Sequence, residues 1–166
     1  GIKVIRQGFG YPSVFNPDTY VQELVRQGKS LEDAREGGCS GCIEVGAFGK
    51  EAYLLTGYLN TVKILEVTLH GGTDPETGRS IGLQTGDPRD FKSYDELYDA
   101  WKKQMAYFVN LKLGVNNYIE RMFSLYAPAT FLSLYIDDCI KKGRDYYDGG
   151  ARYNTQYIQC TGLGTI

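Results

Sequence analysis

CSGCIEVGAFGKEAYLLTGYLN, residues 39–60, places two cysteines three positions apart, Cys39 and Cys42, and a glutamate, Glu44, two residues after the second. The neighbouring residues are mostly glycine, serine and small aliphatic side chains. Four kinds of site could explain this stretch: half of a metal site, a disulfide or redox pair, an ordinary turn with two small thiols, or a reactive thiol with a carboxylate beside it.

The metal and redox alternatives have little support elsewhere in the chain. A structural zinc site needs four ligands, usually from paired Cys-x-x-Cys or Cys/His units. Cys39 and Cys42 form one pair, but Cys139 and Cys160 are far apart in sequence, and His70 is the only histidine. A redox-active Cys-x-x-Cys lies at a helix N-terminus, which lowers the thiol pKa. Here a helix is expected to end before the pair, so buried thiols in a turn remain the main alternative to a reactive site.

The composition is that of a folded protein without a nucleic-acid or membrane partner. The chain has 166 residues, 42% hydrophobic, and its 18 basic and 20 acidic residues give a net charge of -2 without a basic stripe. No apolar run could span a bilayer and no signal peptide is recognisable, so we expect a cytoplasmic protein with reduced cysteines. The missing initiator methionine and the apolar, glycine-punctuated end YIQCTGLGTI indicate a fragment.

Capping signals and apolar periodicity predict a mixed α/β chain. Helices are expected over residues 16–27, 30–37, 61–70, 93–127 and 130–142. Residues 61–70 could instead be a strand because they include β-branched side chains. Residues 73–89 suggest a hairpin or ordered loop, and 152–165 a strand with glycine turns. The longest helix, roughly 45 Å, suits a larger protein than 166 residues.

Gly41-Cys42-Ile43-Glu44 resembles the Gly-Cys-x-Glu signature of the glycyl radical enzymes. The resemblance is to the dehydratase and decarboxylase branch, because the pyruvate formate-lyase branch has adjacent cysteines. Residues 39–60, 61–72, 85–91 and 149–166 are all similar to the members that dehydrate trans-4-hydroxy-L-proline. The segment GAFGK after Glu44 departs from the branches acting on choline, glycerol or propane-1,2-diol. The resemblance therefore covers essentially the whole chain.

The resemblance implies a fragment of a ten-stranded α/β barrel of the pyruvate formate-lyase-like type. Residues 1–166 would be the central part of one catalytic domain, without an internal boundary. The upstream half-barrel and the C-terminal loop that carries the glycyl radical would lie outside this chain, so the fragment alone is expected to be inactive. No bound cofactor is implied. The implied partners are a small-molecule substrate, an activating enzyme that uses S-adenosylmethionine and an iron-sulfur cluster, and a second copy in a homodimer of the full-length enzyme.

In such enzymes the glycyl radical takes hydrogen from a cysteine, and the thiyl radical then takes hydrogen from the substrate. The resemblance gives the cysteine role to Cys42 and an acid/base role to Glu44. Residues two apart in an extended loop point the same way, so both can face one substrate while Ile43 anchors the loop in apolar surroundings. A neutral thiyl radical tolerates a dry pocket, and a positioned carboxylate contributes roughly 10²–10⁴-fold to such a reaction. A surface carboxylate is the alternative for Glu44.

Other residues carry weaker indications. Tyr58 resembles an aromatic side chain that lines the substrate pocket of the hydroxyproline enzymes, and core packing is the alternative. Asp137 and Asp138 are adjacent on an expected helix and would not share a face. His70, at a helix end, is in a favourable position for positive charge.

The sequence thus predicts a radical dehydratase that converts trans-4-hydroxy-L-proline to 1-pyrroline-5-carboxylate and water. One alternative is a related glycyl radical lyase or decarboxylase acting on 4-hydroxyphenylacetate, a diol or choline, or resembling formate acetyltransferase. The other is a non-enzymatic domain in which Cys39 and Cys42 form a structural clip.

Overall fold

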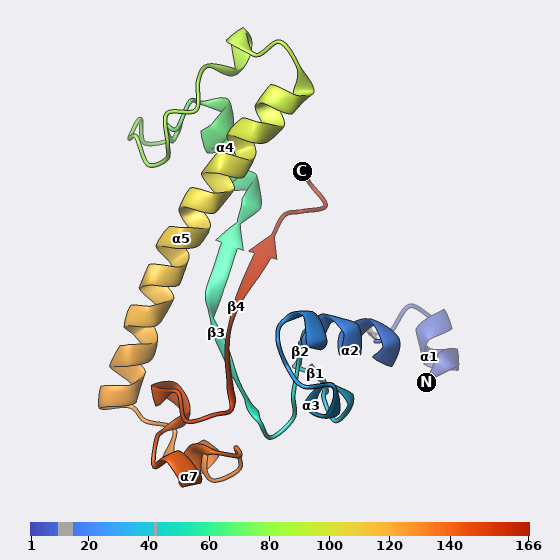
Figure 1. Ribbon diagram of the computed structural model, residues 1–166. Helices are drawn as coiled ribbons and strands as arrows, with labels where there is room; N and C mark the ends of the chain where they lie inside the picture. The colour runs from blue at the N-terminus through green and yellow to red at the C-terminus, as the bar shows by residue number, and fades with distance from the viewer. Residues whose placement is uncertain (10–14, 42) are drawn as a thin grey trace. The chain divides into compact units, whose positions relative to one another are not determined.

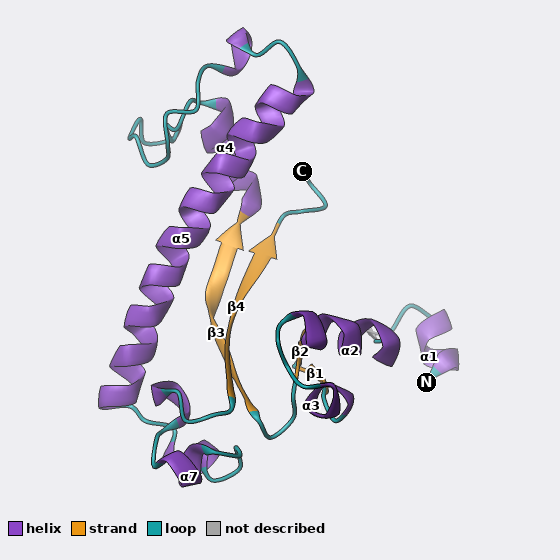
Figure 2. Cartoon of the chain, in the orientation of Figure 1, coloured by secondary structure: helices purple, strands orange, loops and turns teal. Residues whose placement is uncertain are grey.

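The computed structural model describes residues 1–9, 15–41 and 43–166, which form helices and strands in the order of Figure 1. The elements are α1 (Ile2–Arg6), α2 (Pro17–Arg26), α3 (Leu31–Arg35), β1 (Gly38–Ser40), β2 (Glu44–Gly46), β3 (Glu51–Asn60), α4 (Thr61–Leu69), the 3-10 helix η1 (Pro88–Asp90), α5 (Tyr94–Tyr126), α6 (Thr130–Ser133), α7 (Cys139–Lys142), the 3-10 helix η2 (Tyr146–Asp148) and β4 (Tyr153–Thr161). The mixed α/β class predicted from the sequence is therefore observed (Figure 2).

The chain divides into two compact units. The first comprises residues 1–54 and 123–155, and the second comprises residues 55–122 and 156–166. The strands β3 and β4 and the helix α5 each contribute residues to both units.

Two pairs of strands form the sheets. β1 and β2 are antiparallel, with Gly38 opposite Gly46 and Ser40 opposite Glu44. β3 and β4 are neighbours and run in the same direction (Figure 2). Tyr153 N donates to Lys50 O (3.0 Å) where both strands begin, and Thr161 Oγ1 donates to Leu59 O (3.4 Å) near their ends. A parallel pair of this kind is a building block of α/β barrels.

The core of the first unit lies where β3 and β4 begin. Its fully packed residues are Ala52, Leu54, Tyr146 and Ala151. The Tyr146 hydroxyl accepts a hydrogen bond from Tyr53 N (2.6 Å) and donates to Tyr53 O (3.2 Å), so a buried side chain holds the backbone at the start of β3.

The predicted starts of four helices are confirmed because side-chain oxygens cap their free N–H groups. Asn16 accepts from Asp18 N (3.0 Å) and Ser30 accepts from Asp33 N (3.1 Å). Asn60 caps the segment 61–69, which settles its helix-or-strand ambiguity in favour of helix α4. At α5, Ser93 Oγ accepts from Glu96 N at 3.3 Å.

The prediction of one helix over residues 130–142 is wrong. The structure has two short helices, α6 and α7, with a break between them. Asp138 adopts a left-handed conformation (φ 77°), which a continuing α-helix cannot accommodate. Asp137 N donates to Gly49 O at 2.6 Å instead of to a helical carbonyl. Strand β3, in contrast, was not predicted at all.

Within the described ranges, no helix combines the length and the apolar character that a membrane crossing requires.

Candidate active site

Two residues of the signature, Gly41 and Glu44, lie in the β1–β2 hairpin of the first unit. Gly41, in the turn, adopts a left-handed conformation (φ 64°) that favours glycine. The Glu44 carboxylate folds back over this turn, where Oε2 accepts a hydrogen bond from Ile43 N at 3.1 Å. A Cβ atom at position 41 would lie 3.0 Å from the same oxygen. Glycine at 41 therefore supplies both the backbone turn and the room for the carboxylate.

The predicted hairpin residues can be placed except for one. Cys42 lies outside the described residues. Glu44 is half-buried at the start of β2, opposite Ser40. The expectation that Ile43 anchors the segment in apolar surroundings is wrong for this chain, because the Ile43 side chain is 57% exposed.

Glycines at the base of the hairpin allow it to pack closely against the chain that follows. A Cβ atom on Gly38 would lie 2.8 Å from the Phe48 ring. A Cβ atom on Gly46 would lie 2.5 Å from both Glu51 Oε2 and Tyr53 Oη. The glycine-rich composition noted in the sequence thus fixes the hairpin against the first residues of β3.

Tyr58 lies on β3 in the second unit. Its neighbour Gly57 faces α5, since a Cβ atom there would lie 2.8 Å from Lys112 Nζ. The Tyr58 side chain is 64% exposed, so it does not pack into a core in this chain. Glu44 belongs to the first unit and Tyr58 to the second.

A salt-bridge cluster that sequence reasoning missed joins α3 to the starts of β3 and β4. Asp33 accepts from Tyr153 Oη (2.7 Å) and lies 2.9 Å from Lys50 Nζ and 3.1 Å from Arg152 Nη1. The hydrogen bond from Tyr153 and the two cations hold the pKa of Asp33 well below its usual range. No local sequence pattern predicts these contacts, because the partners of Asp33 are 17 to 120 positions away from it in the sequence.

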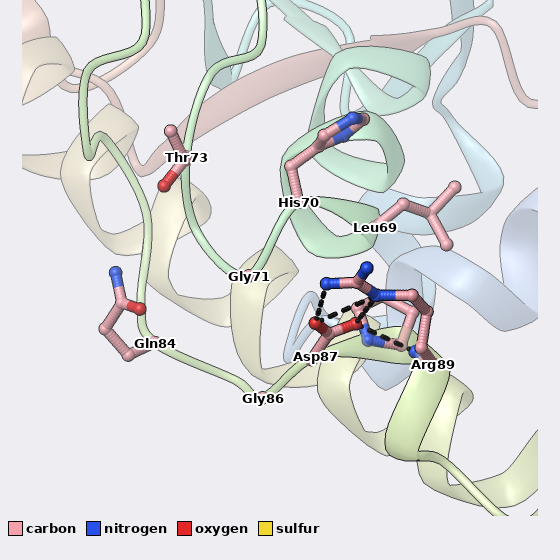
Figure 3. A pocket seen from close by; sticks show the side chains of 9 residues that line it. Leu69, His70, Gly71, Thr73, Gln84, Gly86, Asp87 and Arg89 are labelled. Atoms are coloured by element: carbon pink, nitrogen blue, oxygen red, sulfur yellow. Dashed lines mark hydrogen bonds and ion pairs between the residues drawn. The ribbon is translucent and has the colours of Figure 1, made fainter.

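A pocket of about 860 Å³ belongs to the second unit (Figure 3). It is lined by Leu69, His70, Gly71, Thr73, Gln84, Gly86, Asp87, Pro88 and Arg89. Figure 3 shows the Arg89 guanidinium over the Asp87 carboxylate, and its hydrogen bonds lower the pKa of Asp87 to about 2. His70 Nδ1 lies 2.8 Å from Glu66 O, at the end of α4 as predicted. Neither Glu44 nor Tyr58 lines this pocket.

The three described cysteines lie in different settings. Cys39 is half-buried, Cys139 buried and Cys160 exposed, and burial raises the pKa of the Cys139 thiol. Among residues 1–9, 15–41 and 43–166, no three His, Cys, Asp or Glu side chains are grouped to hold a metal ion. Asp138 is paired with Arg152 at 3.2 Å.

Known proteins resemble this chain along its whole length. It matches the family described as pyruvate formate lyase-like over residues 1–166. It is 53% identical over 164 residues to trans-4-hydroxy-L-proline dehydratase of Clostridioides difficile, covering 99% of this chain and 21% of that protein. It is 32% identical to (2S)-3-sulfopropanediol dehydratase of Klebsiella oxytoca, covering 99% of this chain and 20% of that protein.

A solved structure shows the same fold. The crystal structure of hydroxyproline dehydratase from Clostridioides difficile, with trans-4-hydroxy-L-proline bound, has a TM-score of 0.92 at 53% identity and covers 99% of this chain and 21% of the solved one. The chain thus spans about one fifth of the length of these relatives. The predicted fold, a fragment of the pyruvate formate-lyase-like α/β barrel, is confirmed. The chain belongs to the pyruvate formate lyase-like family of glycyl radical enzymes.

Proposed function

We propose that the protein containing this chain is a radical dehydratase that converts trans-4-hydroxy-L-proline to 1-pyrroline-5-carboxylate and water. The observation that carries this proposal is the 53% identity, over 99% of the chain, to a dehydratase of that substrate. The Gly-Cys-Ile-Glu sequence of residues 41–44 supports the same reaction type.

The proposed reaction begins with hydrogen transfer to a Cys42 thiyl radical from the ring carbon between the nitrogen and the hydroxyl-bearing carbon. The resulting carbon radical expels the neighbouring hydroxyl group, which leaves as water once it has gained a proton, while the ring nitrogen loses its own proton. The product radical then takes the hydrogen atom back from the Cys42 thiol. The thiyl radical is regenerated, and the net change is the loss of one water molecule.

Glu44 is the proposed group that moves the proton during elimination. Its half-buried carboxylate lies beside the backbone N–H of Ile43, only two residues from Cys42. Partial burial limits access of water, which would compete for the same proton. Tyr58, whose side chain on β3 is exposed in this chain, is the proposed aromatic wall of the substrate pocket.

The remaining parts of the machinery lie outside this chain in the proposal. A glycyl radical on another segment of the same protein first forms the thiyl radical by taking the hydrogen atom of the Cys42 thiol. A separate activating enzyme with S-adenosylmethionine and an iron-sulfur cluster installs the glycyl radical. Residues 1–166 form the central part of one catalytic domain, and the full-length enzyme works as a cytoplasmic homodimer under anaerobic conditions.

A second candidate is a related dehydratase with a different substrate. The 32% identity to (2S)-3-sulfopropanediol dehydratase favours this alternative, because the radical chemistry can stay the same while the pocket changes.

Product analysis of the activated full-length enzyme tests the proposal. Under strict anaerobiosis, we expect trans-4-hydroxy-L-proline to disappear with stoichiometric formation of 1-pyrroline-5-carboxylate, detected by mass spectrometry. Turnover of a sulfonated or simple diol in its place would support the second candidate. Stoichiometric zinc in the purified protein, without turnover of either substrate, would instead support the structural clip of Cys39 and Cys42.

A further inference from the structure

A buried ion pair lies at the end of the hairpin strand that carries Glu44. Lys29 Nζ is 3.0 Å from Glu51 Oε1, and the two side chains are 2% and 0% exposed. The other carboxylate oxygen, Glu51 Oε2, accepts a hydrogen bond from Ala47 N at 2.7 Å. Ala47 directly follows β2 and is fully buried. One carboxylate therefore links a buried cation to the backbone beside the proposed reacting group.

Both members of this pair are held in place by neighbours in the first unit. Lys29 Nζ also donates to Gln27 Oε1 at 2.7 Å, and it lies 5.7 Å from the centre of the Tyr153 ring. Glu51 is the first residue of β3, and its carboxylate lies where a side chain at Gly46 would have to be. The last residue of β2 is thus packed directly against the carboxylate.

Stability alone does not account for this arrangement. Removing two charges from water costs several kcal/mol per ion, and well-packed apolar residues in place of a buried pair are often neutral or more stable. What an apolar pair lacks is an acceptor for the Ala47 N–H. The carboxylate supplies that acceptor, and the lysine balances its buried charge.

We propose that Glu51, whose buried charge Lys29 balances, is a positioning residue for the β1–β2 hairpin: its hydrogen bond to Ala47 N sets the direction in which β2 presents Glu44 to the substrate. This inference rests on the proposed function, since it gives Glu44 a role in elimination. Glu44 is three residues from Ala47, roughly 10 Å of extended chain, so a shift at one end of β2 is transmitted to the other. A misplacement of about 1 Å can lower a rate by about 10²-fold.

Two matched double variants of the activated full-length enzyme isolate the acceptor. Lys29→Met/Glu51→Gln removes both charges but keeps a side-chain oxygen that can accept from Ala47 N. Lys29→Met/Glu51→Leu removes both charges and the acceptor. Neither leaves an unpaired buried charge, and only the Gln variant keeps a side-chain oxygen that can accept from Ala47 N.

We expect the Gln variant to keep kcat within about threefold of the wild type and the Leu variant to lose about 10- to 100-fold in kcat with little change in KM. Glycyl radical yield, measured by electron paramagnetic resonance, should be the same in both. Equal kcat in the two variants overturns the proposal, as does a loss in the Leu variant that is matched by an equal loss of radical.

Hydrogen exchange provides a readout that does not depend on the substrate. Backbone amides of residues 44–47 should exchange about 5- to 150-fold faster in the Leu variant than in the Gln variant, because a buried N–H has lost its acceptor. Equal exchange overturns the positioning role even if the substrate is different. Conversely, a wild type that does not dehydrate hydroxyproline refutes the proposed function alone. If the Leu variant does not fold, Lys29→Met/Glu51→Met replaces it, since methionine adapts to irregular space.

Discussion

The Tyr146→Phe substitution tests how the start of β3 is held. The Tyr146 hydroxyl binds both backbone groups of Tyr53, accepting from the N–H at 2.6 Å and donating to the carbonyl at 3.2 Å. The side chain is 6% exposed, and burial raises its pKa to about 12, so the phenol is neutral at physiological pH. Phenylalanine fills the same space and removes only the hydroxyl.

The size of the effect follows from the two lost hydrogen bonds. Each neutral hydrogen bond contributes about 0.5–1.5 kcal/mol net, so the pair contributes about 1–3 kcal/mol. If the opening of this segment is easier by that amount, the Tyr53 amide should exchange with solvent about 5- to 150-fold faster.

Hydrogen exchange with mass spectrometry on the full-length protein measures this effect at residues 51–54. Tyr147→Phe is the matched control, because Tyr147 is the adjacent residue and its ring stacks on that of Phe123, with the ring centroids 5.1 Å apart. Unchanged exchange in Tyr146→Phe, or equally fast exchange in both variants, would refute the role assigned to the Tyr146 hydroxyl.

Three further predictions concern charge, thiol burial and proton transfer. Asp33→Asn should lower the thermal midpoint at pH 7. The depressed pKa of Asp33 in the folded state stabilises the protein above pH 3.8, the ordinary pKa, and this contribution is lost in acid. The difference in midpoint between variant and wild type should therefore shrink as the pH falls below 3.8. Cys139, buried and with a raised pKa, should be alkylated by iodoacetamide only after unfolding in urea, as followed by mass spectrometry. Glu44→Gln should leave the glycyl radical yield unchanged and lower turnover by roughly 10²–10⁴-fold, because an amide cannot exchange the proton that elimination requires; near-normal product formation would mean that Glu44 is only a polar residue of the hairpin.

Local signals in the sequence predicted the helices well. Asn16, Ser30 and Ser93 stand where the structure has capping oxygens, because a cap needs only residues a few positions away. The break in the helix at Asp138 could not be predicted from such local signals. It depends on a left-handed residue and on a bond from Asp137 to Gly49, a partner distant in sequence.

In the candidate site, too, local features were predicted from the sequence and contacts between distant residues were not. Residues 41–44 were recognised from their own spacing and family resemblance, and Glu44 lies on the predicted segment. The supports of the hairpin, Lys29 and Glu51, were not recognised, because neither carries a motif and their contact joins positions 22 residues apart. The exposed position of Ile43 was also missed, since the burial of a loop side chain depends on packing partners that are distant in sequence.

The central claim is that Cys42 carries the radical chemistry, and the Cys42→Ala variant of the full-length enzyme tests it most directly beside Cys39→Ala as control. After anaerobic activation, electron paramagnetic resonance gives the glycyl radical content, and mass spectrometry gives the amount of 1-pyrroline-5-carboxylate from trans-4-hydroxy-L-proline. We predict that Cys42→Ala keeps the glycyl radical and forms no product, whereas Cys39→Ala keeps most of the turnover. Product formation by Cys42→Ala, or equal loss in both variants, would contradict the claim.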